Sequence, residues 1–419
     1  MVEKRNIVLI SIDSLRADHC SFMGYEKITT PTIDKMARKG LFFENAIAAS
    51  VPTAPSIFSS FTGEFPPIDS FSKKAESWRS LFATNITIAF QLRKLGYCTL
   101  SVHKHPWASK YFGFDKGFDY FSSLSDPAKA EKIEKMHKFR RKLDNILDFL
   151  TKKGESTPWE SYYEEIIDVV TNAKRPYFLW VFLLDTHWPY WPPKRYFSSY
   201  SSYVSLLYKY WKIGRKRMLY EKKEKIIIDA YDESIRYADT FVKRLWEDLK
   251  DEDPIFIIHS DHGDGFGEHG FYYHSPRLYE ELIHVPLIIY NADVKGKIKD
   301  PISLRGLPAS IMELIGEENV FPYRSFLDEG EHYVISKVFK EGKRVIAVRM
   351  KDWKFITGEK NKDELYYLRE DPYEQVNVID EHSDIVKEMR NIVKIHVKYE
   401  EEIRKVRNTT LKFKQIERL

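Results

Sequence analysis

The feature that most constrains this chain is an apolar run that ends abruptly in side chains able to bind a metal ion. Residues 254–260 read Pro-Ile-Phe-Ile-Ile-His-Ser and are followed at once by Asp261, His262 and a glycine-rich stretch. Such a run predicts a strand buried within a sheet. A carboxylate and an imidazole at the end of a strand are oxygen and nitrogen ligands for a divalent cation. In isolation, the same pair would be interpreted as an N-cap aspartate and a surface histidine.

Two other predicted strands are also followed by side chains that can bind a metal ion. Residues 6–12 form an apolar run that leads directly into Asp13. Residues 177–184 form another, which is followed by Asp185 and His187. In open α/β sheets, ligands bind in the crevice outside the carboxyl ends of the strands. We therefore expect one site to be assembled from three distant segments of the chain.

The order of the predicted elements indicates an α/β fold. Strands alternate with helical patterns through the first three quarters of the chain, as in a mostly parallel central sheet sandwiched by helices. Later strands with one polar face predict a smaller C-terminal α+β subdomain with an antiparallel sheet. The predicted division is an α/β domain that carries the site at 1–320, with insertions at 128–153 and 196–225, and a C-terminal subdomain at 321–419.

Composition limits the class of protein. With 419 residues, 43% of them hydrophobic, the chain can bury a large core. A net charge of +4, from 66 basic and 62 acidic residues, does not mark a nucleic-acid-binding protein. The two cysteines do not make a disulfide framework. The N-terminus has no secretory-signal pattern and the apolar runs are too short to cross a bilayer, which predicts a cytoplasmic protein.

The insertion at 196–225 is dense in tyrosine and basic side chains and follows the His187 loop. It is open to two interpretations. It could be a lid that contacts an anionic substrate, including one that is lipid-linked or lies at a membrane surface. It could equally be an insertion that packs its aromatic side chains on the body of the protein.

Thr53 is a candidate nucleophile. It stands two residues before Pro55, near the predicted start of a helix. There the helix dipole and the free N–H groups favour negative charge, so a hydroxyl is easier to ionise and a phosphate or sulfate is easier to hold. A metal ion at that oxygen would make it a competent nucleophile at neutral pH. From this segment alone, an ordinary N-cap threonine is the simpler interpretation.

Several short motifs, in one order along nearly the whole chain, resemble those of the sulfatase family of the alkaline phosphatase superfamily. They lie at residues 12–18, 30–34, 53–63, 112–119, 187–189, 260–274, 278–281, 285–286 and 364–375. The resemblance implies the α/β fold of that superfamily and one divalent metal ion. Asp13, Asp261 and His262 would bind this ion, and Thr53, in the nucleophile position, would complete its coordination. Carboxylates with one imidazole suit Mn, Mg or Ca, with Zn also compatible.

The resemblance also implies roles for residues that meet the substrate. His187 matches the family's substrate-oxyanion histidine in a His-x-Pro motif. His274 falls near the position of a lysine or histidine that contacts the leaving group. Lys104 and His105 lie where the family offers further substrate contacts, and Arg16 is another candidate.

Two departures from the family's pattern change the expected chemistry. Sulfatases form formylglycine from a cysteine or serine in a Cys/Ser-x-Pro-x-Arg motif, whereas this chain has Thr53 and, at the arginine position, Ile57. Threonine carries a methyl group on the carbon that would become the aldehyde, so we expect no formylglycine. Ser14 stands where many sulfatases have a second metal-binding aspartate. The candidates for a second ion are Asp185, His187, His269 and His274. Their spacing is not that of the two-zinc phosphodiesterases, so one ion is expected.

These departures favour phosphoryl chemistry. Relatives with a threonine nucleophile cleave or transfer phosphoryl groups, and the implied mechanism is in-line attack by a metal-activated Thr53 on a small anionic phosphodiester or phosphomonoester. His274 or His187 would protonate the leaving oxygen, and water or an acceptor alcohol would resolve the phosphothreonine. Two alternatives stay open: a sulfuric ester hydrolase that works without formylglycine, and a non-catalytic binding protein on the same fold.

Overall fold

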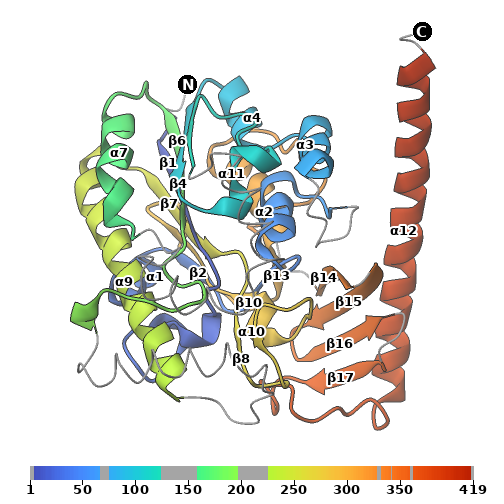
Figure 1. The fold of residues 1–419 in the computed structure, drawn as a ribbon. Coiled ribbons are helices and arrows are strands. Elements are labelled where there is room, and N and C mark those ends of the chain that lie inside the picture. The colour runs from blue at the N-terminus through green and yellow to red at the C-terminus, as the bar shows by residue number, and fades with distance from the viewer. Residues whose placement is uncertain are drawn as a thin grey trace, which may run out of the picture.

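The computed structural model describes residues 4–66, 75–123, 158–196, 225–327, 332–340, 342–358 and 362–416. At its centre lies an eight-stranded sheet with the strand order β12-β2-β11-β7-β1-β6-β4-β5 (Figure 1). Its strands are β1 (Ile7–Ile12), β2 (Leu41–Phe43), β4 (Cys98–His103), β5 (Tyr120–Ser122), β6 (Tyr177–Leu183), β7 (Ile255–Ser260), β11 (Leu287–Tyr290) and β12 (Gly296–Ile298). Only β11 runs antiparallel to its two neighbours within this described sheet. The predicted mostly parallel central sheet is therefore confirmed.

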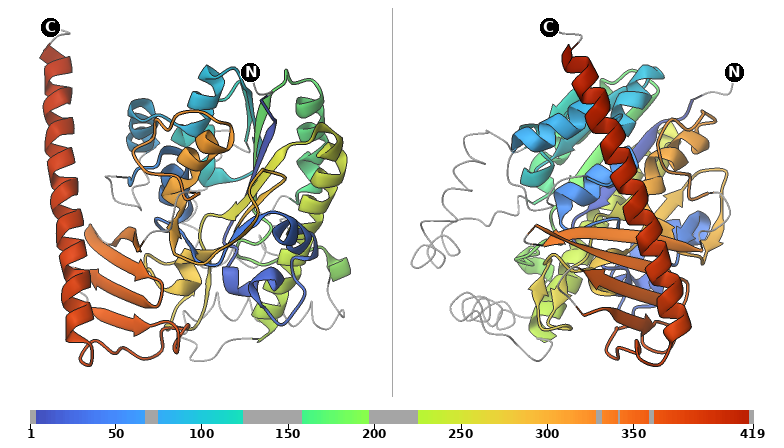
Figure 2. Two further views of the ribbon diagram at one scale, coloured as in Figure 1. Left: turned by 180° about the vertical axis from the view of Figure 1, so that it is seen from behind. Right: turned by 90° about the vertical axis from the view of Figure 1, so that its right-hand side faces the viewer.

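Helices cover both faces of the sheet (Figure 2). Successive side chains of β1 point to opposite faces, so Leu9 joins one buried cluster while Val8 and Ile10 join the other. The first cluster is closed by α2 (Thr53–Thr62), α3 (Ala75–Thr84), α4 (Ile88–Lys94) and α11 (Leu307–Leu314). The second is closed by α1 (Pro31–Lys39), α7 (Glu160–Thr171) and α9 (Lys225–Leu249). This double cover explains why β1, β6 and β7 are continuous apolar runs.

Helix ends follow the local sequence. Pro31 is the first residue of α1, where its missing N–H leaves no helical hydrogen bond unmade. Gly40 follows the last residue of α1, and a Cβ there would lie only 2.2 Å from the carbonyl oxygen of Ile289, so the helix can pass β11 only with glycine. Thr87 caps α4 by accepting a hydrogen bond from the backbone N–H of Phe90 at 3.1 Å.

A second, antiparallel sheet follows in the C-terminal quarter, as predicted. It contains β14 (Tyr333–Lys340), β15 (Lys343–Met350), β16 (Trp353–Gly358) and β17 (Glu364–Tyr367), in that order. The helix α12 (Ser383–Ile416) packs Val386 and Met389 on the buried Val348, Phe355 and Leu365 of this sheet. In Figure 1, the far half of α12 extends beyond the sheet.

The C-terminal sheet supports the segment that leads into α2. The backbone N–H of Lys337 on β14 donates to the carbonyl oxygen of Ala49 at 2.9 Å. Ser50 Oγ donates to the carbonyl oxygen of Lys337 at 2.6 Å, and Ser336 Oγ donates to that of Ala48 at 2.7 Å. The segment that leads into Thr53 and α2 is thus anchored to β14 of the C-terminal sheet.

Two smaller groups of strands complete the described structure around the site. β10 (His284–Val285), β3 (Ala46–Ile47) and β13 (Ile302–Ser303) form a three-stranded sheet. β8 (Gly265–Phe266) and β9 (Tyr272–Tyr273) form a short hairpin directly after β7. The predicted insertion at 128–153 lies outside the described residues, and so does that at 196–225 apart from its first and last residues.

Candidate metal centre and active site

Three segments of the chain meet at the carboxyl ends of β1 and β7. These strands are parallel neighbours, with Ile12 in register with Ser260, so Asp13 and Asp261 leave the sheet side by side. Ligand atoms of Asp13, Asp261 and His262 all lie within 4.8 Å of one another, and the three residues are fully buried. The predicted convergence of distant strand ends is observed for these two strands.

The donor atoms of this cluster fit a divalent cation. Asp261 Oδ2 is buried and has no hydrogen-bond partner among the described residues, and it lies 3.4 Å from His262 Nε2. Burial and the neighbouring carboxylate of Asp13 raise the pKa of Asp261 well above its ordinary value. A cation would neutralise both carboxylates and occupy the unpartnered oxygen. Two carboxylates and one imidazole are a donor set that Mn, Mg, Ca and Zn all accept.

His262 is oriented toward this cluster. Its Nδ1 lies 3.0 Å from the carbonyl oxygen of Gly263, which leaves Nε2 facing Asp13 and Asp261. Burial lowers the pKa of His262 to about 4. A neutral imidazole with one nitrogen anchored to the backbone is the form that binds metal ions.

Thr53 places its hydroxyl at the same point. Thr53 Oγ1 lies 3.2 Å from His262 Nε2, and the residue is 4% exposed. Thr53 is the first residue of α2, Pro52 occupies the N-cap position, and no side chain caps this helix end. The Thr53 hydroxyl therefore faces the metal-binding cluster instead of serving as the ordinary N-cap that the isolated segment would suggest.

Asp13 is braced by two neighbours. His105 Nε2 donates to Asp13 Oδ2 at 2.7 Å, and Ser14 Oγ donates to Asp13 Oδ1 at 2.7 Å. The backbone N–H of Ser14, which has a left-handed φ of 59°, donates to Asp261 Oδ1 at 3.1 Å. Burial alone would raise the pKa of Asp13, but His187 and His105 lower it below its ordinary value. Ser14 thus orients both carboxylates, and His105 holds a predicted ligand in addition to the substrate contact that the resemblance implies.

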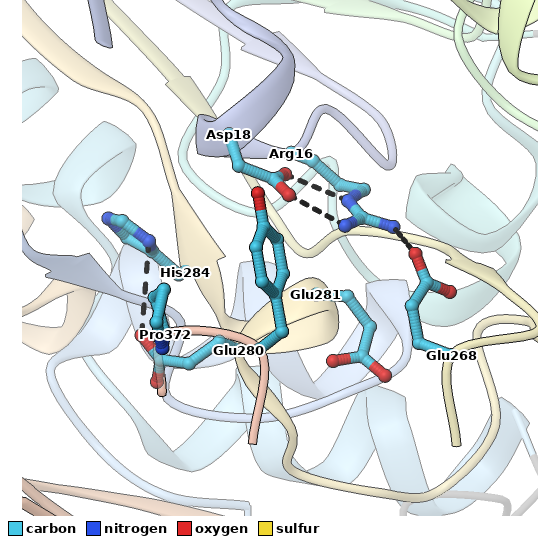
Figure 3. Close-up of a pocket in the computed structure, with 8 residues that line it drawn as sticks. Arg16, Asp18, Glu268, Glu280, Glu281, His284 and Pro372 are labelled. Atoms are coloured by element: carbon cyan, nitrogen blue, oxygen red, sulfur yellow. Dashed lines mark hydrogen bonds and ion pairs between the residues drawn. The ribbon is translucent and has the colours of Figure 1, made fainter. Parts of the chain in front are cut away.

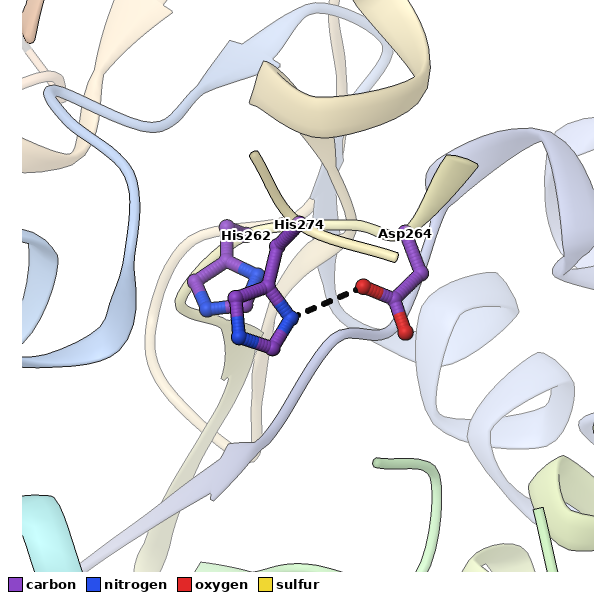
Figure 4. Close-up of side chains that lie close together, drawn as sticks. All are labelled: His262, Asp264 and His274. Carbon is purple, nitrogen blue, oxygen red and sulfur yellow. Dashed lines mark hydrogen bonds and ion pairs between the residues drawn. The ribbon is translucent and has the colours of Figure 1, made fainter. Parts of the chain in front are cut away.

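His187 and His274 lie beside the cluster. The His274 ring centroid is 4.6 Å from that of His262 and 5.1 Å from that of His187. His274 Nδ1 donates to Asp264 Oδ1 at 2.9 Å (Figure 4). Burial would lower the pKa of His274, but the carboxylate of Asp264 raises it above its ordinary value. The two predicted substrate histidines, which come from segments far apart in sequence, are therefore brought together.

Lys104 and Arg16 are engaged with protein groups. Lys104 Nζ lies 3.6 Å from Glu165 Oε2 on α7. Arg16 is 2% exposed and its guanidinium binds Asp18 at 2.7 Å and Glu268 at 2.8 Å, next to a small acidic cavity (Figure 3). Their predicted substrate contacts stay predictions.

Asp185, considered for a second ion, belongs to neither cluster of metal-binding side chains among the described residues. Burial, with a contribution from Glu160, raises the pKa of its carboxyl to about 8. One residue at the site was not singled out from the sequence: Asp264, which binds His274. Its only signal was a further acid two positions after His262, inside the glycine-rich stretch.

The geometry agrees with comparison to known proteins. A model of the sulfatase family matches residues 5–317. The chain belongs to the sulfatase family. Members of this family are ester hydrolases that generally use a divalent metal ion, and the cluster around Asp13 supplies candidate ligands for one.

Curated relatives within the sulfatase family cover most of the chain. An arylsulfatase of Clostridium perfringens is 27% identical over 93% of this chain and 94% of the relative. Human iduronate 2-sulfatase is 26% identical over 76% of this chain and 62% of the relative.

Solved structures share the fold. A phosphonate monoester hydrolase of Agrobacterium radiobacter superposes with a TM-score of 0.70 at 17% identity, covering 94% of this chain and 96% of that one. The phosphonate monoester hydrolase of Silicibacter pomeroyi gives a TM-score of 0.71 at 16% identity, with the same coverage. The predicted alkaline-phosphatase and sulfatase-like architecture is confirmed. No helix in the described part of the chain is long and apolar enough to span a membrane.

Proposed function

We propose that this protein is a metal-dependent phosphoric ester hydrolase or phosphotransferase in which Thr53 is the nucleophile. The observation that carries the proposal is the position of Thr53 Oγ1, 3.2 Å from His262 Nε2 at the N-terminus of α2. Threonine at this position cannot become formylglycine, whereas its alkoxide can attack phosphorus. A divalent ion held by Asp13, Asp261, His262 and Thr53 would ease ionisation of the hydroxyl and neutralise charge on the transferred group.

The residues of the site can carry out each step of a phosphoryl transfer. Thr53 Oγ1, whose proton is first released to solvent, attacks phosphorus in line and the bond from phosphorus to the leaving oxygen breaks. The bonding electron pair goes to the leaving oxygen, which takes a proton from the imidazolium of His274. Because Thr53 is the first residue of α2, the dipole and N–H groups of this helix end would favour negative charge on the transferred group. Water or an acceptor alcohol, deprotonated by the same imidazole, then resolves the phosphothreonine.

A sulfuric ester is the second candidate substrate, because the curated relatives named above are sulfatases. Attack by a threonine alkoxide on sulfur would leave a stable sulfate ester on the enzyme, so turnover would stop after one cycle. Phosphate esters avoid this trap because a phosphothreonine beside a metal ion and a general base is hydrolysable.

The deciding experiment is an ester panel run with purified protein under Mn, Mg, Ca and Zn. We expect turnover of nitrophenyl phosphate monoesters or diesters, abolished in Thr53→Ala, and a peptide containing Thr53 that gains the mass of one phosphoryl group on rapid quenching. Thr62→Ala is the matched control, because Thr62 is a buried threonine of the same helix whose hydroxyl bonds backbone groups, donating to the Phe58 carbonyl at 2.7 Å and accepting from the Glu64 N–H at 3.2 Å. Multiple turnover of nitrophenyl sulfate that survives Thr53→Ala would reject the proposed nucleophile. Absence of bound metal and of any turnover would favour the binding protein.

A further inference from the structure

The hairpin that follows β7 places Asp264 and His274 opposite each other. In this hairpin Gly265 pairs with Tyr273 and Phe266 with Tyr272, so Asp264 and His274 flank its open end. The hydrogen bond from His274 Nδ1 to Asp264 Oδ1 measures 2.9 Å, and Asp264 is fully buried (Figure 4). The register of two very short strands thus creates a carboxylate-imidazole pair next to the metal-binding cluster.

The carboxylate of Asp264 is itself held rigidly. Its second oxygen, Oδ2, accepts a hydrogen bond of 2.7 Å from the hydroxyl of Tyr190, which is also fully buried. The backbone on both sides of Asp264 is closely packed: a Cβ at Gly263 would lie 2.1 Å from the carbonyl oxygen of Glu281, and one at Gly265 would lie 2.6 Å from the Phe271 ring. Asp264 is therefore a fixed acceptor.

The backbone on the histidine side is also constrained. Tyr273, the residue before His274, has a left-handed φ of 65°. This conformation is strained for a bulky side chain and persists only where its surroundings hold it. The Tyr273 ring stacks on Trp188 with centroids 4.6 Å apart, and Trp188 directly follows His187. The stack therefore ties the backbones of the two active-site histidines together.

His262, Asp264 and His274 also lie close enough to suggest a second metal site. The hydrogen bonds argue against this. Both ring nitrogens of His262 are committed, Nδ1 to the Gly263 carbonyl and Nε2 to the cluster with Asp13 and Asp261. Nδ1 of His274 is committed to Asp264. What remains is an oriented imidazole whose Nε2 is available to the substrate.

We propose that Asp264 is a positioning residue that fixes the tautomer and ring orientation of His274, so that Nε2–H is presented to the leaving oxygen. This inference rests on the proposed function, in which His274 protonates that oxygen. During the transfer the Nε2 proton moves to the leaving oxygen, while the Nδ1 proton stays bonded to the Asp264 carboxylate. A fixed proton donor matters most when the leaving oxygen is weakly acidic. The site is therefore suited to esters of alkyl alcohols, such as sugar or polyol phosphates, over aryl esters.

The test compares leaving groups. We expect Asp264→Asn and the milder Tyr190→Phe to lower kcat/KM for alkyl phosphate esters, by about 10²- to 10⁴-fold for the former, with little change for nitrophenyl esters that need no proton. His274→Gln should show the same leaving-group pattern. Adding Asp264→Asn to His274→Gln should cause little further loss, because the two residues act as one unit.

Two measurements separate this inference from a general effect on the fold or on the metal. Elemental analysis should find the same metal content in Asp264→Asn as in the wild type. In metal-free protein labelled with 15N-histidine, the Nδ1–H signal of His274, assigned by its loss in His274→Gln, should shift in Asp264→Asn. Asp232→Asn is the matched control, because it breaks another buried pair, in which His19 Nδ1 lies 2.8 Å from Asp232 Oδ1. It should leave both the leaving-group dependence and the His274 signal unchanged.

Three outcomes would overturn the inference. Equal losses for alkyl and aryl esters would show that Asp264 does not serve leaving-group protonation. A second metal equivalent in the wild type that is lost in Asp264→Asn would assign Asp264 to a second ion. An unchanged His274 signal in that variant would show that the carboxylate does not fix the ring. Wild-type protein that turns over no phosphate ester would instead reject the proposed function, and with it the leaving-group role, while the 15N spectra would still decide the positioning.

Discussion

Asp261→Asn should stabilise the metal-free protein and make it insensitive to metal ions. Asp261 Oδ1 accepts the backbone N–H groups of Ser14 at 3.1 Å and His262 at 2.9 Å, and an asparagine oxygen can keep both bonds. Oδ2 is buried beside Asp13 and has no hydrogen-bond partner in the part of the chain that the structure describes, and a buried unsatisfied polar group costs about 1–3 kcal/mol. An asparagine Nδ2 in its place is a donor, and Oδ2 lies 3.4 Å from His262 Nε2. We therefore expect a gain of about 1–3 kcal/mol without metal.

With added metal, the wild type should instead be the more stable of the two proteins. A ligand that binds only the folded state at about 1,000 times its Kd stabilises it by about 4 kcal/mol, and the variant lacks a ligand for the ion. The assay is urea unfolding of both proteins in chelator and in excess Mn²⁺, after the wild-type Kd has been measured by calorimetry. Asp232→Asn serves as the control, because this buried carboxylate binds His19 and Lys27, so its loss should destabilise the protein and leave the metal response intact.

The reasoning would be refuted by either of two results. If Asp261→Asn were less stable than the wild type in chelator, the two carboxylates would not be in conflict without an ion. If both proteins gained equally from Mn²⁺, the ion would bind elsewhere.

Two further predictions concern His105 and Asp239. His105→Gln should weaken metal affinity by about 10- to 100-fold, measured by calorimetry, because His105 braces the ligand Asp13; unchanged affinity would remove that role. Burial raises the pKa of Asp239 from 3.8 to about 6, so between these pH values the unfolded chain binds fewer protons and this group makes stability fall as pH rises. In Asp239→Asn this decrease in the free energy of unfolding, which is up to about 3 kcal/mol in the wild type, should therefore be absent. The measurement is the urea midpoint of both proteins at several pH values from 3.5 to about 6.5. A difference between variant and wild type that stays constant over this range would contradict the prediction.

The strand ends were predictable from the sequence because they depend on local patterns. A run of buried apolar residues followed by an acid is visible without knowing the partners of the strand, and Asp13 and Asp261 were found in this way. The departure at Thr53 was equally visible, because a threonine cannot supply formylglycine in any fold. The same pattern also pointed to Asp185, which belongs to neither metal-binding cluster of the described residues. A strand end shows that a side chain leaves the sheet, but not toward which neighbour.

Contacts across long sequence distances were not predictable. His105 binds Asp13 across 92 positions, whereas the family resemblance implied only a substrate contact for it. Asp264 reaches His274 through a hairpin whose strands contain two residues each, which is too short to leave a periodic signal. The direction of Lys104, whose ammonium group lies toward Glu165 on α7, likewise depends on how that helix packs.

The sequence by itself determined the elements, the family and the departure at Thr53 from the residue types that form formylglycine, because each follows from residue types at fixed spacing along the chain. Only the tertiary structure decided which of the candidate side chains meet. Hydrogen bonds and ligand distances of about 3 Å are set by strand order, register and helix packing, and a shift of one residue in register would turn each side chain to the opposite face. For this reason the nucleophile could be proposed from the sequence, whereas the Asp264 carboxylate that orients His274 could be found only in the folded protein.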